Sequence, residues 1–113
     1  MILKENIIGN IIKVIVDRPL GSRHPKHKNI VYTVNYGYIP GVIAQDGEEQ
    51  DAYILGVDTA VTEFVGRVVA NIHRINDVED KLVVAPTDMS FTKDEILDKV
   101  AFQEQFFDIE IIM

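Results

Sequence analysis

The apolar positions of this chain fall in short β-branched runs separated by turn residues. Residues 11–16 form the first run, with Lys13 as its one polar member, and they predict a mostly buried strand. Pro19 and Gly21 then interrupt the pattern, so residues 17–29 are predicted to form a loop. Further runs predict strands over residues 30–34, 52–57, 61–75 and 81–85.

Glycine and proline positions refine this pattern. The aromatic segment 36–39 is expected to turn at Pro40-Gly41, and residues 76–80 form a tight acidic turn. Gly66 lies inside an apolar run, so we expect a bulge or a close approach of two backbones there.

The C-terminal part of the chain has the helical period. Thr92 with Glu95 three residues later is a capping box, which predicts a helix start. The expected apolar stripe contains Ile96, Leu97, Val100 and Ala101 and ends near Phe106-Phe107. Residues 108–113 are predicted to form a short final strand.

Five or six short strands and one late helix predict a mainly β fold. A small OB-like closed β-barrel with one C-terminal α-helix removes exposed sheet edges at this chain length. Residues 1–113 are expected to form a single domain.

Composition narrows the function classes. The net charge of −7 argues against general nucleic-acid binding, which needs a broad basic face. The chain has no cysteine, no secretory signal and no apolar run long enough to span a membrane, so we expect a cytoplasmic protein without a membrane partner.

Charge is distributed unevenly along the chain. Residues 18–28 carry Arg18, Arg23, Lys26 and Lys28 without an acid, whereas residues 46–51 are acidic without a base. A solvated charged loop is the ordinary explanation of either cluster alone. Together, carboxylates and cations at the strand ends of one small barrel suit a polyphosphate, since metal and basic side chains both neutralise phosphate oxygens.

The acidic segment 46–51 is the candidate metal site. Asp46, Glu48 and Asp51 follow a turn and lead into a buried strand. Carboxylate oxygens without cysteine favour Mg²⁺, Mn²⁺ or Ca²⁺ over Zn²⁺. His24 and His27 lack a third nitrogen ligand evident from sequence, which argues against zinc.

Two tyrosines and a second acidic cluster complete the candidates. Tyr36 and Tyr38 should face opposite sides of a strand, so one is expected in the core and the other could donate to phosphate. Asp77, Glu79 and Asp80 immediately precede Lys81.

Residues 34–41, Val-Asn-Tyr-Gly-Tyr-Ile-Pro-Gly, followed by Asp-Gly-Glu-Glu-Gln-Asp at 46–51, resemble the hallmark of the soluble (family I) inorganic pyrophosphatases. The segment 77–86 is similar to the second acidic segment of that family. The resemblance implies an OB-like barrel and Mg²⁺-dependent hydrolysis of pyrophosphate to two phosphates, with Mn²⁺ as an alternative metal.

The resemblance also implies roles for individual residues. The metal ligands would be Asp46, Glu48, Asp51, Asp77 and either Asp80 or Glu79, with Glu48 and Asp51 catalytic. The phosphate-binding residues would be Lys13, Tyr36 and Lys81. The family arginine aligns with His24 when counted without gaps, so Arg18 or Arg23 is expected to replace it. The middle signature acid, normally aspartate, is Glu48 here, and the family's later Tyr-Lys phosphate-binding pair and second helix are missing.

Two other functions stay open at this point. The scaffold could hydrolyse another phosphoanhydride or phosphoester, or it could bind metal and phosphate without catalysis. Homo-oligomerisation is a further expectation, because Ile109, Ile111 and Ile112 are apolar and could be buried against a second copy.

Overall fold

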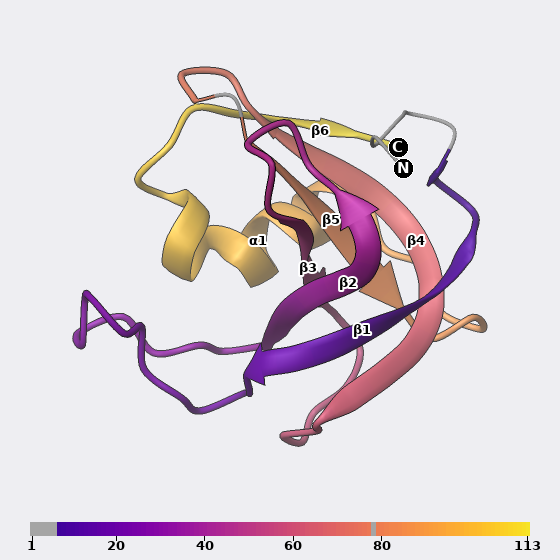
Figure 1. Ribbon diagram of the computed structural model, residues 1–113, viewed down its shortest axis with the longest axis horizontal. Helices are drawn as coiled ribbons and strands as arrows, with labels where there is room; N and C mark the ends of the chain where they lie inside the picture. The colour runs from indigo at the N-terminus through magenta and orange to yellow at the C-terminus, as the bar shows by residue number, and fades with distance from the viewer. Residues whose placement is uncertain (1–6, 78) are drawn as a thin grey trace.

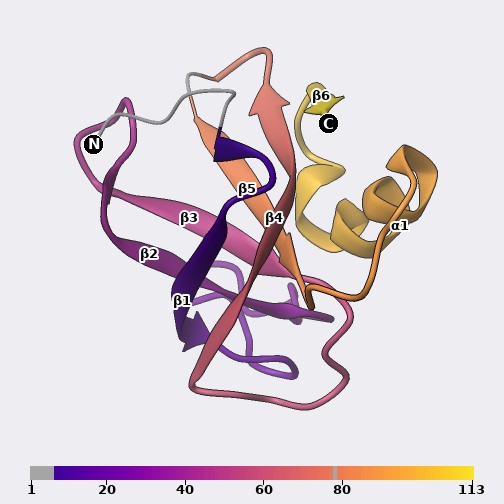
Figure 2. The ribbon, with the colours of Figure 1, turned by 90° about the vertical axis from the view of Figure 1, so that its right-hand side faces the viewer.

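Five strands close into a barrel, and one helix packs on its outer face (Figures 1 and 2). The computed structural model describes residues 7–77 and 79–113. Its elements are β1 (Ile11–Arg18), β2 (Asn35–Ile43), β3 (Glu49–Ile54), β4 (Glu63–Arg74), β5 (Asp80–Ala85), α1 (Lys93–Glu104) and β6 (Ile109–Ile112). The predicted class, a closed β-barrel with a C-terminal helix, is confirmed.

The ring runs β1-β2-β3-β5-β4 and closes where β4 pairs with β1. Every pair is antiparallel except β3 with β5. The 12-residue β4 is long enough for its first half to pair with β1 and its second half to pair with β6. Because both halves of this edge are paired, β4 exposes little backbone for unwanted association.

Two apolar cores lie on opposite faces of the same strands. The first fills the barrel and draws on all five of its strands, through Val14, Ile39, Ala52, Ile54, Val68, Leu82 and Val84. The second lies between the outer face and α1, and includes Tyr36, Tyr53, Ile72, Val83, Ile96 and Val100. Ile109 and Ile111 pack against this second core within the same chain.

Strand alternation decides which residues reach the outer face. On β3, Ala52 belongs to the barrel interior, whereas Tyr53 belongs to the core under α1. On β5, Leu82 points into the barrel, and its neighbour Lys81 points outward into a pocket. The period of two therefore presents Asp51 and Lys81 on the same outer face.

The helix begins as predicted. The Thr92 hydroxyl accepts from the Glu95 N–H at 3.2 Å, and a Glu95 carboxylate oxygen accepts from the Thr92 N–H at 2.8 Å. The prediction for Leu97 is wrong, because this side chain is 47% exposed. It follows the fully buried Ile96 by one residue, which turns it away from the sheet.

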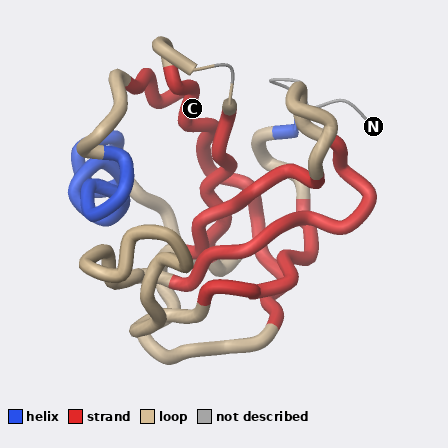
Figure 3. Tube along the Cα trace, turned by 60° about the vertical axis from the view of Figure 1, so that its left-hand side comes forward, coloured by secondary structure: helices blue, strands red, loops and turns tan. Residues whose placement is uncertain are grey.

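Two strand predictions are also wrong. Residues 30–34 do not form a strand; they fold back on residues 21–24 in the long loop between β1 and β2, shown as loop in Figure 3. Tyr32 exchanges backbone hydrogen bonds with Gly21 and Ser22 there, so the run pairs with its own loop. In contrast, β2 continues through Pro40 instead of turning, with an irregular register between Ile39 and Ile43.

Gly66 allows a close approach of two backbones, as expected. A Cβ at this position would lie 2.5 Å from the Ala85 carbonyl oxygen on β5. The register irregularity of β4 lies elsewhere, between Val68 and Ala70. No helix among the described residues is long and apolar enough to cross a membrane.

Gly37→Ala, inside β2, should destabilise the barrel more than a glycine-to-alanine change at an open turn. The new Cβ would lie 1.9 Å from the Ile15 carbonyl oxygen, so β1 and β2 would have to separate. We expect a loss of about 3 kcal/mol in the free energy of unfolding, measured by urea denaturation. Gly47→Ala is the matched control, since its Cβ meets nothing and only its positive φ costs about 1–2 kcal/mol. Equal losses in the two variants would contradict this account.

Candidate active site

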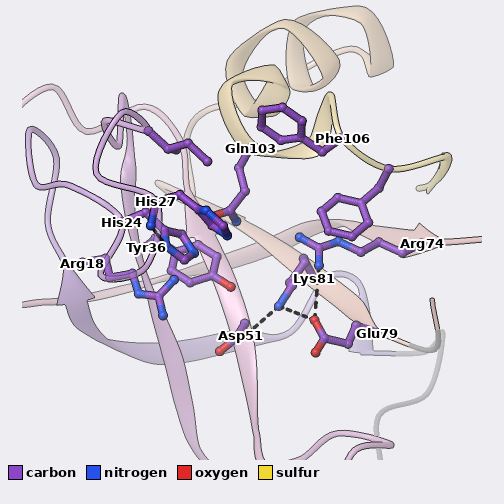
Figure 4. Close-up of a pocket in the computed structure, with 12 residues that line it drawn as sticks. Arg18, His24, His27, Tyr36, Asp51, Arg74, Glu79, Lys81, Gln103 and Phe106 are labelled. Atoms are coloured by element: carbon purple, nitrogen blue, oxygen red, sulfur yellow. Dashed lines mark hydrogen bonds and ion pairs between the residues drawn. The ribbon is translucent and has the colours of Figure 1, made fainter. Parts of the chain in front are cut away.

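A cavity of about 370 Å³ opens on the outer face of the barrel (Figure 4). Its walls come from the loop between β1 and β2, from all five barrel strands, and from the end of α1 with the residues that follow it. The lining residues are Arg18, His24, His27, Ile30, Tyr36, Asp51, Arg74, Glu79, Lys81, Gln103, Phe106 and Phe107. The pocket therefore collects side chains that are up to 89 positions apart in the sequence.

Lys81 joins two carboxylates at the bottom of the pocket. Its Nζ lies 2.6 Å from Asp51 Oδ2 and 2.9 Å from Glu79 Oε2, as the dashed lines in Figure 4 show. The Lys81 side chain is 6% exposed, whereas about a third of each carboxylate is exposed to the pocket. Parallel pairing of β3 with β5 brings these residues together.

Arg74 enters from the end of β4. Its Nε and Nη2 donate to the two oxygens of Glu104 at 2.9 and 2.7 Å, and its Nη1 donates to Glu79 at 3.3 Å. The Glu104 carboxylate on α1 is fully buried, so the two-point pairing keeps a buried charge compensated. Burial opposes the guanidinium charge, but the Glu104 hydrogen bonds outweigh it and raise the pKa of Arg74.

Arg18 is the third cation of the pocket. Its Nη1 donates to the Tyr32 hydroxyl at 2.6 Å, and its guanidinium lies over the rings of Tyr32 and Tyr36. Within the described residues no carboxylate lies in ion-pair distance of Arg18. It is consequently the cation best placed to meet an incoming anion.

A buried chain of hydrogen bonds connects Arg18 to Arg74. The Tyr32 hydroxyl donates to Gln103 Oε1 at 2.7 Å, and Gln103 Nε2 donates to the Tyr53 hydroxyl at 2.7 Å. Tyr53 then donates to Glu104 at 2.5 Å. Each member restricts the rotamer of the next, so one hydrogen-bonded network holds both arginines in place.

Tyr36 is the buried one of the two tyrosines. The prediction that Tyr36 and Tyr38 face opposite sides is wrong, because residues two apart in a strand share a face. Burial, and then the negative charge of Asp51, raise the pKa of Tyr36 well above 10. Its phenol therefore keeps its proton at neutral pH and can act as a hydrogen-bond donor in the pocket. Tyr38 is half-buried and does not line the pocket.

The two histidines form part of the loop wall, with ring centroids 5.0 Å apart. His24 Nδ1 accepts from the backbone N–H groups of Lys26 and His27, which places the proton of the neutral ring on Nε2. Burial, and then the positive charge of Arg18, lower the pKa of His24. The ring is consequently neutral at pH 7.

Four residues singled out from sequence meet in this pocket: Arg18, Tyr36, Asp51 and Lys81. Glu79, rather than Asp80, accompanies them. The physical reason is alternation, because Asp80 is one step from Lys81 and faces away. Asp80 binds His73 Nδ1 at 2.7 Å and accepts from Asn71 at 3.1 Å.

The other predicted site residues lie outside the pocket lining. Asp46 and Glu48 are exposed in the turn between β2 and β3, where the Glu48 N–H donates to Asp46. Lys13 pairs with Glu63 at 3.1 Å on the barrel surface. Arg23 donates to the Lys28 carbonyl, and Asp77 lies in the turn after β4.

The carboxylates present are suited to a metal that arrives with its ligand. Across residues 7–77 and 79–113 no group of three or more His, Cys, Asp or Glu side chains is arranged to hold a metal ion. Asp51 and Glu79 nevertheless converge on one cation, Lys81. Mg²⁺ commonly uses one or two protein carboxylates together with substrate phosphates and water, and Asp51 and Glu79 are the carboxylates that line this pocket.

Sequence reasoning missed Arg74, Gln103 and the aromatic pair at 106–107. A signal for the first was present, since Arg74 is a charged residue two positions after Ile72, in an apolar strand run, and therefore shares the face of Ile72. Gln103 and Glu104 follow Val100 by three and four residues and continue the buried stripe of α1. Polar residues at such positions indicate a buried polar network.

Solved structures of inorganic pyrophosphatases share this fold. The enzyme from Ehrlichia chaffeensis superimposes with a TM-score of 0.69 and 18% identity, over 91% of this chain and 85% of that one. The Neisseria gonorrhoeae enzyme gives 0.65 and 21%, over 88% and 73%. The Helicobacter pylori enzyme gives 0.60 and 16%, over 96% and 85%.

No protein-family model and no curated protein sequence matches the chain. At these identities the structural similarity establishes the fold. The chain thus has the fold of the inorganic pyrophosphatases, and the resemblance found in the sequence is confirmed at that level.

Glu104→Ala should cost about 3–5 kcal/mol of unfolding free energy, because the buried Arg74 guanidinium keeps only its single 3.3 Å contact with Glu79. Urea denaturation measures this loss. Glu110→Ala, at an exposed position of β6, is the matched control and should change stability by less than about 0.5 kcal/mol. A loss in Glu104→Ala no larger than the control's would show that the buried pair contributes nothing net.

Stability should fall as pH rises above 10. Burial, followed by Glu104, raises the pKa of Tyr53 well above 10, and Tyr36 is shifted in the same direction. Above pH 10 the unfolded chain releases these protons while the folded chain retains them, so alkali favours unfolding. Each tyrosine contributes a slope of about 1.4 kcal/mol per pH unit.

Urea denaturation across this pH range measures the slope, and Tyr53→Phe should make it shallower. The ultraviolet absorbance of tyrosinate follows ionisation directly. Four tyrosines that all ionise near pH 10 while the protein remains folded would contradict the expectation.

Proposed function

We propose that this chain hydrolyses the phosphoanhydride bond of pyrophosphate in a Mg²⁺-dependent reaction that yields two phosphates. One observation carries the proposal. In a chain of net charge −7, three cations and two carboxylates converge in a single pocket on the barrel that inorganic pyrophosphatases share. We further propose a cytoplasmic location, which suits a chain without cysteine.

The cations would bind the phosphate oxygens. Arg18 presents a guanidinium that no carboxylate of the described residues pairs with, and its planar fork can bind two oxygens at once. Lys81 and Arg74 add positive charge deeper in the pocket. The protonated Tyr36 phenol supplies a further donor beside Asp51.

Asp51 and Glu79 would hold the metal. Mg²⁺ bound there supplies charge neutralisation of the phosphate oxygens and lowers the pKa of a coordinated water. The proposal departs from the family pattern, since Asp46, Glu48, Asp77 and Asp80 lie outside the pocket lining. Asp51 is therefore our candidate for accepting the proton of the attacking water, in place of Glu48.

The surrounding network keeps these groups in position. Lys81 holds both carboxylates by direct ion pairs, and Glu104 fixes Arg74. Such fixed donors need no rearrangement when charge develops on the leaving phosphate, which is the condition for electrostatic catalysis.

A second candidate function is binding of pyrophosphate or a related phosphoanhydride without hydrolysis. The observation that favours it is the absence, among residues 7–77 and 79–113, of a three-ligand metal group. Under this alternative Lys81 would neutralise Asp51 and Glu79 permanently, and the pocket would act as an anion receptor.

Phosphate release from pyrophosphate with Mg²⁺ tests the proposal. We expect turnover that a chelator abolishes and that Mg²⁺ or Mn²⁺ restores. Asp51→Asn should reduce kcat by about 100-fold or more, because the isosteric amide neither binds the metal well nor accepts the proton. Asp98→Asn, at an exposed position of α1, is the control and should retain full activity.

Calorimetry with pyrophosphate separates the two candidates. Tight binding without phosphate release at any metal concentration would favour the anion receptor. If pyrophosphate is neither bound nor hydrolysed, both candidate functions are wrong.

A further inference from the structure

One wall of the pocket is apolar and aromatic. The cavity is lined by Ile30 from the loop between β1 and β2, and by Phe106 and Phe107, which follow α1. Figure 4 shows Phe106 on the helix side, across the pocket from Asp51. The cavity lining is therefore partly charged and partly apolar.

Phe106 and Phe107 have different structural roles. The Phe107 ring lies 3.7 Å from the Arg74 guanidinium and covers it. Phe106 is 62% exposed although it lines the cavity. Its ring thus has apolar surface that the chain itself does not bury, in the wall of the cavity that holds the charged groups.

Inorganic pyrophosphate makes no use of such a wall. Every outer atom of the ion is a charged oxygen, and contact with phenylalanine would remove water from it without a compensating hydrogen bond. The cavity volume of about 370 Å³ falls within the range of pockets that bury drug-sized organic ligands. The apolar part of the lining consequently points to a substrate with an organic part.

We propose that the natural substrate is a nucleoside diphosphate, a choice that rests on the proposed phosphoanhydride hydrolysis. Its two phosphates lie among Arg18, Lys81 and Arg74, and its base lies against Phe106 and Ile30. A planar base can stack on the exposed Phe106 ring. The His24 Nε2–H, left over from the two backbone contacts of Nδ1, is a donor for a base or ribose acceptor.

The reaction is hydrolysis at the terminal phosphorus. The water oxygen forms a bond to that phosphorus, and the bond from phosphorus to the bridging oxygen breaks. The bridging oxygen leaves with the electron pair as part of the nucleoside monophosphate. One water proton passes to Asp51 and then to solvent, and the products are nucleoside monophosphate and phosphate.

Steady-state hydrolysis of ADP, pyrophosphate and an alkyl diphosphate tests the proposal. We expect the highest kcat/KM for ADP. Phe106→Ala should lower kcat/KM for ADP about tenfold more than for pyrophosphate, as expected for loss of one stacked base. Leu97→Ala is the matched control, since it shortens another exposed apolar side chain near the same end of the chain but outside the pocket lining, and it should leave both values unchanged.

Calorimetric binding of AMP provides a readout without turnover. AMP should bind more tightly than phosphate, and Phe106→Ala should remove most of that advantage. If AMP binds in this way but neither ADP nor pyrophosphate is hydrolysed, the base subsite stands while the proposed hydrolysis fails.

Three results would overturn the inference. Hydrolysis of pyrophosphate but not of ADP would leave the proposed function intact and would show that the pocket has no base subsite. A higher kcat/KM for the alkyl diphosphate than for ADP would show that the apolar wall binds an aliphatic group and not a planar base. If Phe106→Ala lowers kcat/KM equally for ADP and pyrophosphate, Phe106 shapes the pocket but does not stack on a base.

Discussion

The buried ion pair of Arg74 with Glu104 is the constraint on which the pocket depends. A fully buried carboxylate requires a partner, and the two-point contact fixes the end of α1 against the end of β4. Through Tyr53 and Gln103 the same carboxylate reaches Tyr32 and thereby Arg18. Positions on opposite sides of the cavity are therefore set by one network, to which the helix contributes Gln103 and Glu104.

This arrangement divides the positive charge of the pocket into two kinds. Lys81 and Arg74 are each paired with carboxylates, which partly neutralise the positive potential that these two side chains produce in the pocket. Arg18 is held by a neutral phenol, which orients the guanidinium without reducing its charge. Attraction of an anion in a chain of net charge −7 thus depends most on Arg18.

Much of the barrel could be predicted from sequence, because β-branched runs, the capping box and the turns all act locally. The strand predicted over residues 30–34 is wrong because a short apolar run does not reveal whether its backbone hydrogen bonds go to a strand or to its own loop. The site was harder to predict. Alternation could have grouped Glu79 with Lys81, but the parallel pairing of β3 with β5 that adds Asp51 is not encoded by any local pattern. The acidic motif gave the fold correctly, whereas the direction of Asp46 and Glu48 depends on the turn between β2 and β3.

The position of Glu104 late in the sequence also orders events during synthesis. A chain is made from its N-terminus, so β4 and Arg74 leave the ribosome before the end of α1 does. Until Glu104 emerges, the guanidinium has no buried partner, and the hydrogen-bonded path toward Arg18 lacks Gln103. The barrel strands can pair in that interval, but the anion pocket is incomplete. The lining of the pocket is therefore complete only after the end of α1 has been synthesised and has packed on the barrel.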